Sequence, residues 1–312
     1  MWDKRSGWLF CMESHLVFGT SDGGRSWRTL TMPWLSAERL DAGHFVTRDD
    51  GWVLAAPPRL YETLDGGRRW YVKALPSADG LIQTVWSLPG QARAWAGGGV
   101  FRPSGHPSGP NWAIKRYNSG GWALLQSVIY ARSAGGGWTA QAVPPCDLSI
   151  FDLRFWDERR GIALGDRCLY WTDTGGQRWN LATFHGRYQN TRGRFPYLGA
   201  ESPALRPPRV AFLGGAAGWL SLDDNLLFGT RDGGRNWSAV GLPGTPYFDQ
   251  MAFTDSQHGL ALHLGRGLYE TVDGGVKWTR LRVDFLAQSL NCTGGGRCWV
   301  LSNDVLYVVT WE

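Results

Sequence analysis

Four aspartates recur in this chain inside one eight-residue pattern, and a repeated carboxylate is the first candidate for chemistry. Carboxylates act as acid, base or nucleophile when two of them converge on one bond, as in glycoside hydrolysis. In each copy, however, two glycines follow the aspartate and supply the positive φ angles of a tight turn. We therefore predict that these carboxylates accept hydrogen bonds from N–H groups of their own turns. The four copies are TSDGGRSW around Asp22, TLDGGRRW around Asp65, TRDGGRNW around Asp232 and TVDGGVKW around Asp273.

A tryptophan closes each copy, and we predict that it covers the turn and packs against a neighbouring sheet. A looser copy, TDTGGQRW at Thr172–Trp179, carries Thr174 in place of the aspartate, and a worn copy, RSAGGGW, spans Arg132–Trp138. The tryptophans to which we assign this structural role are Trp27, Trp70, Trp179, Trp237 and Trp278.

The elements that position these turns follow from their spacing. The copies recur with a period of about 40 residues, and the segments between them are short apolar runs rich in β-formers. A period of that length in a strand-rich chain is typical of a β-propeller whose blades have four antiparallel strands. We predict seven blades, with eight as the alternative, in a single domain over residues 1–312 with insertions at about 97–126 and 184–208. We expect Met1–Lys4 to begin inside the first strand of the first blade, and the last blade to hold three strands.

The pattern resembles the Asp-box, or BNR, signature, S/T-x-D-G-x-x-x-W, and is spread over nearly the whole chain. The resemblance implies an all-β propeller, but it says little about function, because both enzymes and binding proteins carry the motif.

Signatures of catalysis are missing from the sequence. Sialidases of this superfamily carry Arg-Ile-Pro near the start, and the nearest fragment here is Phe101-Arg102-Pro103. A glycosidase would need two converging carboxylates, for which the chain offers Asp147, Asp152, Asp223 and Asp249. Zincin, P-loop and dinucleotide-binding motifs do not occur. We predict no enzyme activity, no cofactor and no metal site.

Five cysteines bear on the compartment. Cys292 and Cys298 flank a short turn and are placed to pair across a hairpin, while Cys146 and Cys168 lie at matching ends of two strands of one repeat. Two disulfides would favour an oxidising compartment, with free buried thiols as the alternative. We expect an exported protein, periplasmic or lumenal and peripheral to a membrane, with a cytoplasmic location left open.

Charge and composition indicate the kind of partner. The net charge is +5, which suits an acidic protein surface or an anionic membrane. Nucleic acid is not expected, because the tryptophans are committed to strands. The second insertion combines arginines with aromatic residues, a composition found at interface hot spots. Its predicted partner-binding residues are Arg187, Tyr188, Arg192, Arg194, Phe195, Tyr197 and Arg206, with Arg209 just after it.

Within the superfamily, the order of the elements is similar to that of the photosystem II stability and assembly factors. The shared order is a first strand such as Met251-Ala252-Phe253, a Gly-Trp strand, an aromatic strand and then TxDGGxxW, ending in a three-strand unit. This resemblance implies a non-catalytic exported platform that holds a subunit of a membrane complex through a basic patch. The alternative is a secreted glycan-binding or sialidase-like propeller.

Overall fold

The computed structural model describes most of the chain, with gaps mainly in loops. Residues described are 3–11, 16–30, 39–56, 59–73, 80–88, 93–103, 114–116, 122–133, 136–143, 149–165, 167–185, 208–222, 225–241, 244–293, 295–303 and 305–311. All regular structure in these ranges is β.

The strands form seven sheets that follow one another along the chain. The first three sheets are β1 (Gly7–Cys11), β2 (Leu16–Thr20) and β3 (Arg28–Thr29); β4 (Arg39–Phe45), β5 (Gly51–Ala56), β6 (Arg59–Thr63) and β7 (Tyr71–Lys73); and β8 (Gly80–Ser87), β9 (Ala94–Pro103), β10 (Ile114–Arg116), β11 (Trp122–Arg132) and β12 (Trp138–Gln141). The fourth and fifth are β13 (Ile150–Phe155), β14 (Gly161–Gly165), β15 (Leu169–Thr172) and β16 (Asn180–Leu181); and β17 (Thr183–His185), β18 (Arg209–Leu213), β19 (Ala217–Leu222), β20 (Leu226–Thr230) and β21 (Asn236–Ala239). The last two are β22 (Gln250–Phe253), β23 (Gly259–His263), β24 (Gly267–Thr271) and β25 (Thr279–Arg280); and β26 (Ser289–Thr293), β27 (Arg297–Ser302) and β28 (Val305–Thr310).

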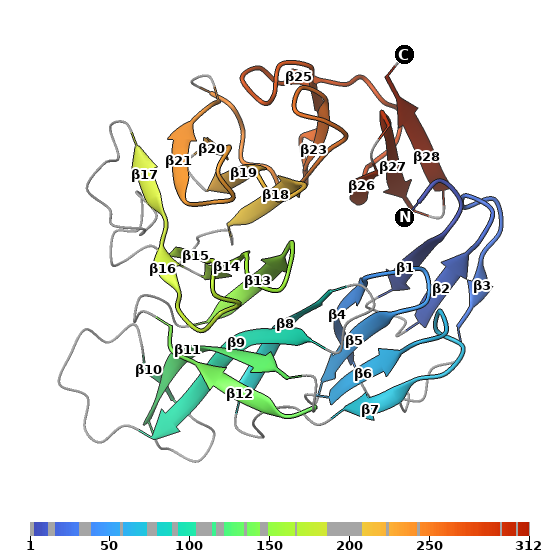
Figure 1. Cartoon of the computed structure of the whole chain (residues 1–312). Coiled ribbons are helices and arrows are strands. Elements are labelled where there is room, and N and C mark those ends of the chain that lie inside the picture. Colours follow the sequence, from blue (N-terminus) through green and yellow to red (C-terminus); the bar gives the residue numbers. More distant parts are fainter. Residues whose placement is uncertain are drawn as a thin grey trace.

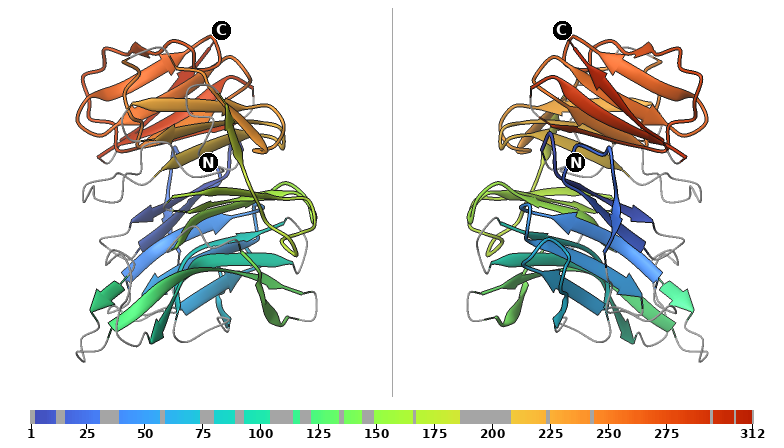
Figure 2. Two further views of the ribbon diagram at one scale, coloured as in Figure 1. Left: turned by 90° about the vertical axis from the view of Figure 1, so that its left-hand side faces the viewer. Right: turned by 90° about the vertical axis from the view of Figure 1, so that its right-hand side faces the viewer.

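The sheets are arranged around a central axis as the blades of a seven-bladed β-propeller (Figure 1). Side views show the blades twisted and stacked face to face around the ring (Figure 2). Consecutive strands of a blade pair antiparallel, and the second strand is often fully buried, as in β14 and β23. Such a strand is covered on both faces, which explains its continuous apolar sequence. The prediction of a seven-bladed all-β propeller is confirmed.

Stacked aromatic rings join successive blades. Trp8 of the first blade lies on Phe45 of the second, with ring centroids 3.8 Å apart and planes 5° from parallel. Trp95 lies on Phe155 in the same way at 3.6 Å and 8°. These contacts account for the tryptophan at the second position of both strands, because the indole supplies a large flat surface to the next blade.

Close approach between blades also explains the second glycine of the DGG turns. Gly24 of the first blade has φ +87°, and a Cβ there would stand 2.6 Å from Cδ2 of Leu306 in β28. The first and last blades are therefore in contact, which closes the ring. Both three-stranded sheets of the described chain meet at this junction (Figure 1).

Three details differ from the sequence-based expectation. Asp3–Ser6 form a turn, in which Asp3 Oδ1 accepts the N–H groups of Arg5 and Ser6, so they are not a strand. Residues 97–103, expected in a loop, belong to β9 and pair with β11, so part of the first insertion extends the third blade. Residues 183–185 form β17, which pairs in parallel with β21 at the outer edge of the fifth blade. The open edge of β21 offers unpaired backbone groups, with which this segment can pair.

The disulfide between Cys292 and Cys298 joins paired residues of β26 and β27. Cys168 is also disulfide-bonded, and Cys146 lies outside the described residues. Cys11 is free.

Candidate functional site

The aspartates of the DGG turns accept hydrogen bonds from groups of their own turns. In the second blade, Oδ1 of Asp65 accepts the N–H groups of Arg68 and Arg69 at 2.9 and 2.8 Å and the hydroxyl of Thr63 at 3.0 Å. The hydroxyl oxygen of Thr63 in turn accepts the N–H of Gly67 at 2.8 Å. Asp22, Asp232 and Asp273 have corresponding partners in their own turns.

The titration of these carboxyls reflects the same contacts. Burial by itself would raise the pKa of Asp65, but the hydrogen bonds from Arg69, Thr63 and Arg68 together hold that pKa below its ordinary value. A carboxylate kept ionised and bonded to its own turn does not serve as a general acid. In the looser copy, the Thr174 hydroxyl takes the place of the carboxylate and accepts the N–H of Arg178 at 2.9 Å.

The tryptophans of the pattern are packing residues. Trp237 is fully buried, and its Nε1 donates to the carbonyl of Gly234 at 2.9 Å. Trp27 and Trp278 make the same bond in their turns at 3.1 Å. Trp70 and Trp179 meet the edges of Phe45 and Phe155 with nearly perpendicular rings.

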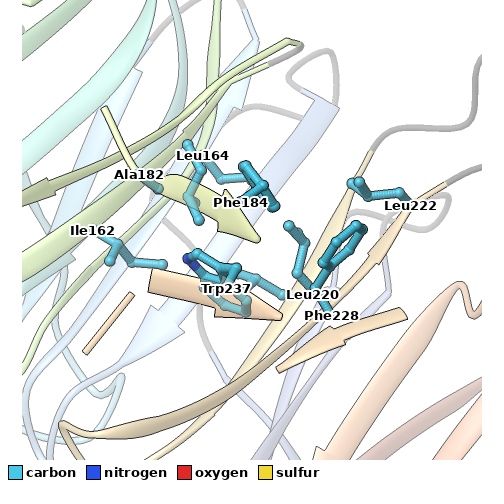
Figure 3. Close-up of a cluster of buried hydrophobic side chains, with 10 residues drawn as sticks. Ile162, Leu164, Ala182, Phe184, Leu220, Leu222, Phe228 and Trp237 are labelled. Atoms are coloured by element: carbon cyan, nitrogen blue, oxygen red, sulfur yellow. The ribbon is translucent and has the colours of Figure 1, made fainter. Parts of the chain in front are cut away.

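The predicted partner-binding insertion is only partly visible. Arg187, Tyr188, Arg192, Arg194, Phe195, Tyr197 and Arg206 lie outside the described residues. Arg209 is exposed and begins β18, the first strand of the fifth blade in the antiparallel series. Phe184, within the expected bounds of the insertion, is instead buried in the core between the fourth and fifth blades, where its ring meets Phe228 at 5.1 Å (Figure 3).

The seam between the fourth and fifth blades departs from the aromatic pattern. Ile162 stands where the first, third and fifth blades have a stacking tryptophan. Instead Trp156, in the loop after β13, tilts against Phe212 of the fifth blade at 5.0 Å and 55°. The core beneath is filled by Ile162, Leu164, Phe184 and Trp237 (Figure 3).

Two crevices open at this seam, on the side of the molecule that carries the DGG turns. The larger, of about 820 Å³, is lined by Leu88, Trp156, Asp157, Glu158, Arg159, Arg160, Asp173 and Arg235. The smaller, of about 220 Å³, shares three of those residues and is lined by Trp156, Arg160, Trp171, Thr172, Gly215, Ala216, Asp232, Gly233 and Arg235. We call the residues that line these two crevices the seam site.

Arginines and tryptophans of the seam site are held in place by their neighbours. Arg235 stacks over Trp171, with its Cζ 4.7 Å from the ring centroid, and its Nη2 lies 3.4 Å from Asp173. Arg160 pairs with Asp157 at 2.7 Å, while Arg159 donates to the backbone carbonyl of Asp173 at 3.2 Å. The site is thus of mixed charge, with exposed arginine heads beside half-buried indoles. Arginine and tryptophan are among the residues enriched at interface hot spots.

Sequence reasoning missed the seam site. The available signal was the replacement of Gly-Trp by Gly161-Ile162, next to the charged run Asp157–Arg160. That signal shows that the fourth blade departs from the Gly-Trp pattern, but it does not show which residues of the fifth blade lie opposite.

The carboxylates weighed for glycosidase chemistry are engaged elsewhere. Asp152 accepts a hydrogen bond from Nε of Arg154 at 3.1 Å, and Oδ2 of Asp249 accepts the N–H of Leu264 at 2.7 Å. Asp147 and Asp223 lie outside the described residues. Among the residues that are described, no cluster of three or more His, Cys, Asp or Glu is arranged to hold a metal ion. No helix in that part of the chain has the length and apolar character needed to cross a bilayer.

Comparison with known proteins adds two kinds of similarity. No family model matches the chain. Over 168 residues the chain is 29% identical to the photosystem II assembly lipoprotein Ycf48 of Synechococcus sp. (strain CC9902). Half of this chain is therefore similar to a photosystem assembly protein. The match covers 52% of the chain and 46% of the relative, so it spans less than half of the relative's length.

Solved structures share the fold at low identity. A structure described as YCF48 bound to D1 peptide superposes with a TM-score of 0.64 at 17% identity, covering 99% of this chain and 91% of that one. A streptogramin B lyase superposes with a TM-score of 0.66 at 9% identity, covering 99% and 91%. At these identities the structural likeness shows the propeller fold alone, since one fold serves binding proteins and enzymes.

Proposed function

We propose that this chain is a non-catalytic propeller that docks on a protein subunit of a larger complex during its assembly or stabilisation. The observation that carries the proposal is the seam site, where Trp156, Trp171 and Arg235 reach a crevice large enough for a peptide segment. Pockets of this size with a few convergent polar groups are the usual places for ligands.

The relatives supply the class of partner. Sequence similarity to a photosystem assembly lipoprotein supports a role in assembling a membrane complex, of which a photosynthetic complex is one. The Ycf48 structure holds a D1 peptide, which makes an extended peptide of a complex subunit a reasonable occupant of the seam site. We extend the proposal to an exported location peripheral to a membrane, which the disulfide-bonded Cys168, Cys292 and Cys298 support.

We further propose that the second insertion contributes to docking. Two hydrogen bonds join its preceding strand to the seam. The backbone N–H of Thr183 donates to the carbonyl of Arg235 at 2.8 Å, and the side chains of His185 (Nε2) and Asn236 (Oδ1) are bonded at 2.9 Å. The arginines Arg187, Arg192 and Arg194 follow within a few residues of this junction. An anionic membrane surface is the second partner that the net charge would suit.

The test is a salt-titrated pull-down from a native membrane fraction with the full chain. We expect Arg160→Ala/Arg235→Ala, and separately the triple alanine variant of the three insertion arginines, to weaken capture of the protein partner at least tenfold. Arg68→Ala is the matched control, because Arg68 occupies in the second blade the position that Arg235 has in the fifth. Capture that survives both variants at every salt concentration contradicts docking at the seam site and insertion.

Catalysis is tested separately. We expect no hydrolysis of sialosides or β-glucans above a heat-inactivated control. Turnover of either substrate would overturn the non-catalytic assignment in favour of the sialidase-like alternative, and glycan-array binding would favour a lectin-like role.

A further inference from the structure

A second cavity lies away from the seam site, among the first strands of the second, third and fourth blades. It has a volume of about 250 Å³ and lies between β4, β8 and β13, which line the centre of the ring (Figure 1). Its polar lining comes from His44, Gln83, Asp152 and Arg154, and its aromatic walls include Trp86 and Phe151. Residues of three different blades thus converge on one small space.

His44 has an unused hydrogen-bonding atom in this cavity. Its imidazole lies on Trp86 with ring centroids 4.2 Å apart and planes 27° from parallel. The residue as a whole is half-buried, yet its Nε2 is fully enclosed and has no hydrogen-bond partner among the described residues. A buried polar atom without a partner carries a desolvation penalty that a ligand can relieve.

Arg154, which lines the same cavity as His44, has hydrogen-bond donors that are not used. Its Nε donates to Oδ2 of Asp152 at 3.1 Å, which fixes the guanidinium in orientation. Its terminal amino groups have no partner among the described residues. Those two groups form the fork that binds a carboxylate through two parallel hydrogen bonds.

We propose that this cavity binds a carboxylate group. The terminal amino groups of Arg154 take the two carboxylate oxygens, and His44 donates from Nε2 in the tautomer that carries its proton there. Trp86 and Phe151 cover the carbon atoms next to the carboxylate.

The titration of His44 is consistent with this role. Burial, followed by the nearby charge of Arg154, lowers the pKa of His44 to about 4, so the ring is neutral at neutral pH and keeps one N–H to donate. A cavity of this size holds a small carboxylic acid or the last residue of a peptide. The ligand is therefore either a free acid or the C-terminal carboxylate of a protein chain. This site is separate from the seam site and does not rest on the proposed docking there.

The test follows the His44 imidazole by NMR in the full-length protein labelled with ¹⁵N-histidine. The probes are N-acetyl-Ala-Ala with a free carboxylate, the same peptide as its C-terminal amide, and propionate. We expect the acid peptide to shift the His44 signals saturably and the amide to bind at least tenfold more weakly. Propionate as tight as the acid peptide would identify a free acid as the ligand, and peptide binding at least tenfold tighter would identify a chain terminus.

Variants separate the carboxylate contacts from general effects. Arg154→Gln should weaken the acid peptide at least tenfold, because the fork that holds both carboxylate oxygens is gone. Arg280→Gln, at an exposed position of β25 away from both sites, is the control and should bind as wild type. Equal affinity for acid and amide in the wild-type protein, or unchanged affinity in a folded Arg154→Gln variant, would overturn the proposal. The acid–amide comparison decides even if that variant does not fold.

Discussion

The indole ring of Trp219 lies flat on the phenyl ring of Phe253, with ring centroids 3.4 Å apart and planes 6° from parallel. Trp219 belongs to the fifth blade and Phe253 to the sixth, so the stack joins two blades. Trp278, which closes the DGG turn of the sixth blade, meets the edge of Phe253 at 5.9 Å and 78°. Trp219 also donates from Nε1 to the carbonyl of Gly274 in that turn at 2.7 Å. One phenyl ring thus links the turn of its own blade to the body of the preceding one.

Removing the phenyl ring of Phe253 should lower the stability of the protein. Phe253→Ala removes a buried side chain from between two indoles, and we expect a loss of about 3–5 kcal/mol in the free energy of unfolding. Urea denaturation followed by circular dichroism measures it. Tyr71→Ala is the control, since Tyr71 is 48% exposed, and its loss should stay below about 0.5 kcal/mol. Equal losses in the two variants would contradict the role of the stack.

The DGG turns should contribute stability and not partner binding. Asp65→Ala leaves the N–H groups of Arg68 and Arg69 without their acceptor, and we expect a loss of about 1–3 kcal/mol. Asp65→Asn keeps an acceptor oxygen and should lose less. Thermal unfolding measures both, and pull-down measures docking. A well-folded Asp65→Ala variant that no longer captures the partner would make the turn a functional site.

Replacing the second glycine of a DGG turn by any residue with a Cβ should destabilise the protein. At Gly234, with φ +85°, a Cβ would stand 2.8 Å from Cγ2 of Ile162 in the preceding blade. Gly234→Ala therefore combines backbone strain with overpacking, and we expect a loss of about 2–4 kcal/mol. Gly244→Ala is the matched control, because Gly244 has φ +89° with open space around it. Its loss should be limited to about 1–2 kcal/mol, and a Gly234→Ala variant no worse than this would contradict the close approach.

Stability should fall as the pH is lowered through the range in which His44 differs between the folded and unfolded chain. In the unfolded chain His44 takes up a proton near pH 6.5, whereas in the folded protein its pKa is about 4. The unfolded state thus binds the extra proton between these values, so the stability present above pH 6.5 declines toward pH 4, by at most about 3 kcal/mol. Denaturant titrations across this range in wild type and His44→Gln measure the difference. An identical pH dependence in both would contradict the low pKa.

Local sequence patterns predicted much of the architecture. The repeat around Asp65 and Asp273 predicted the turns and, through its period, the number of blades. A turn is formed by consecutive residues, so aspartate and glycine at fixed positions indicate its conformation. Cys292 and Cys298 were recognisable for the same reason, since a short hairpin brings near neighbours together. Asp3 and Lys4 were wrongly assigned to a strand and residues 97–103 to an insertion outside the blade, because strand ends and long hairpins depend on pairing across a sheet.

The sequence by itself determined the repeat: its period, its turns and the tryptophans that cover them are properties of about 40 consecutive residues. Only the tertiary structure decided which side chains of different blades lie next to one another. Trp156 meets Phe212, and His44 and Arg154 line one cavity, because the ring brings residues far apart in the chain close together. Each of those pairs depends on the angle and spacing between whole blades, which arise from packing over many side chains. No local pattern encodes that geometry, and so the seam site and the cavity lined by His44 and Arg154 became visible only in the closed ring.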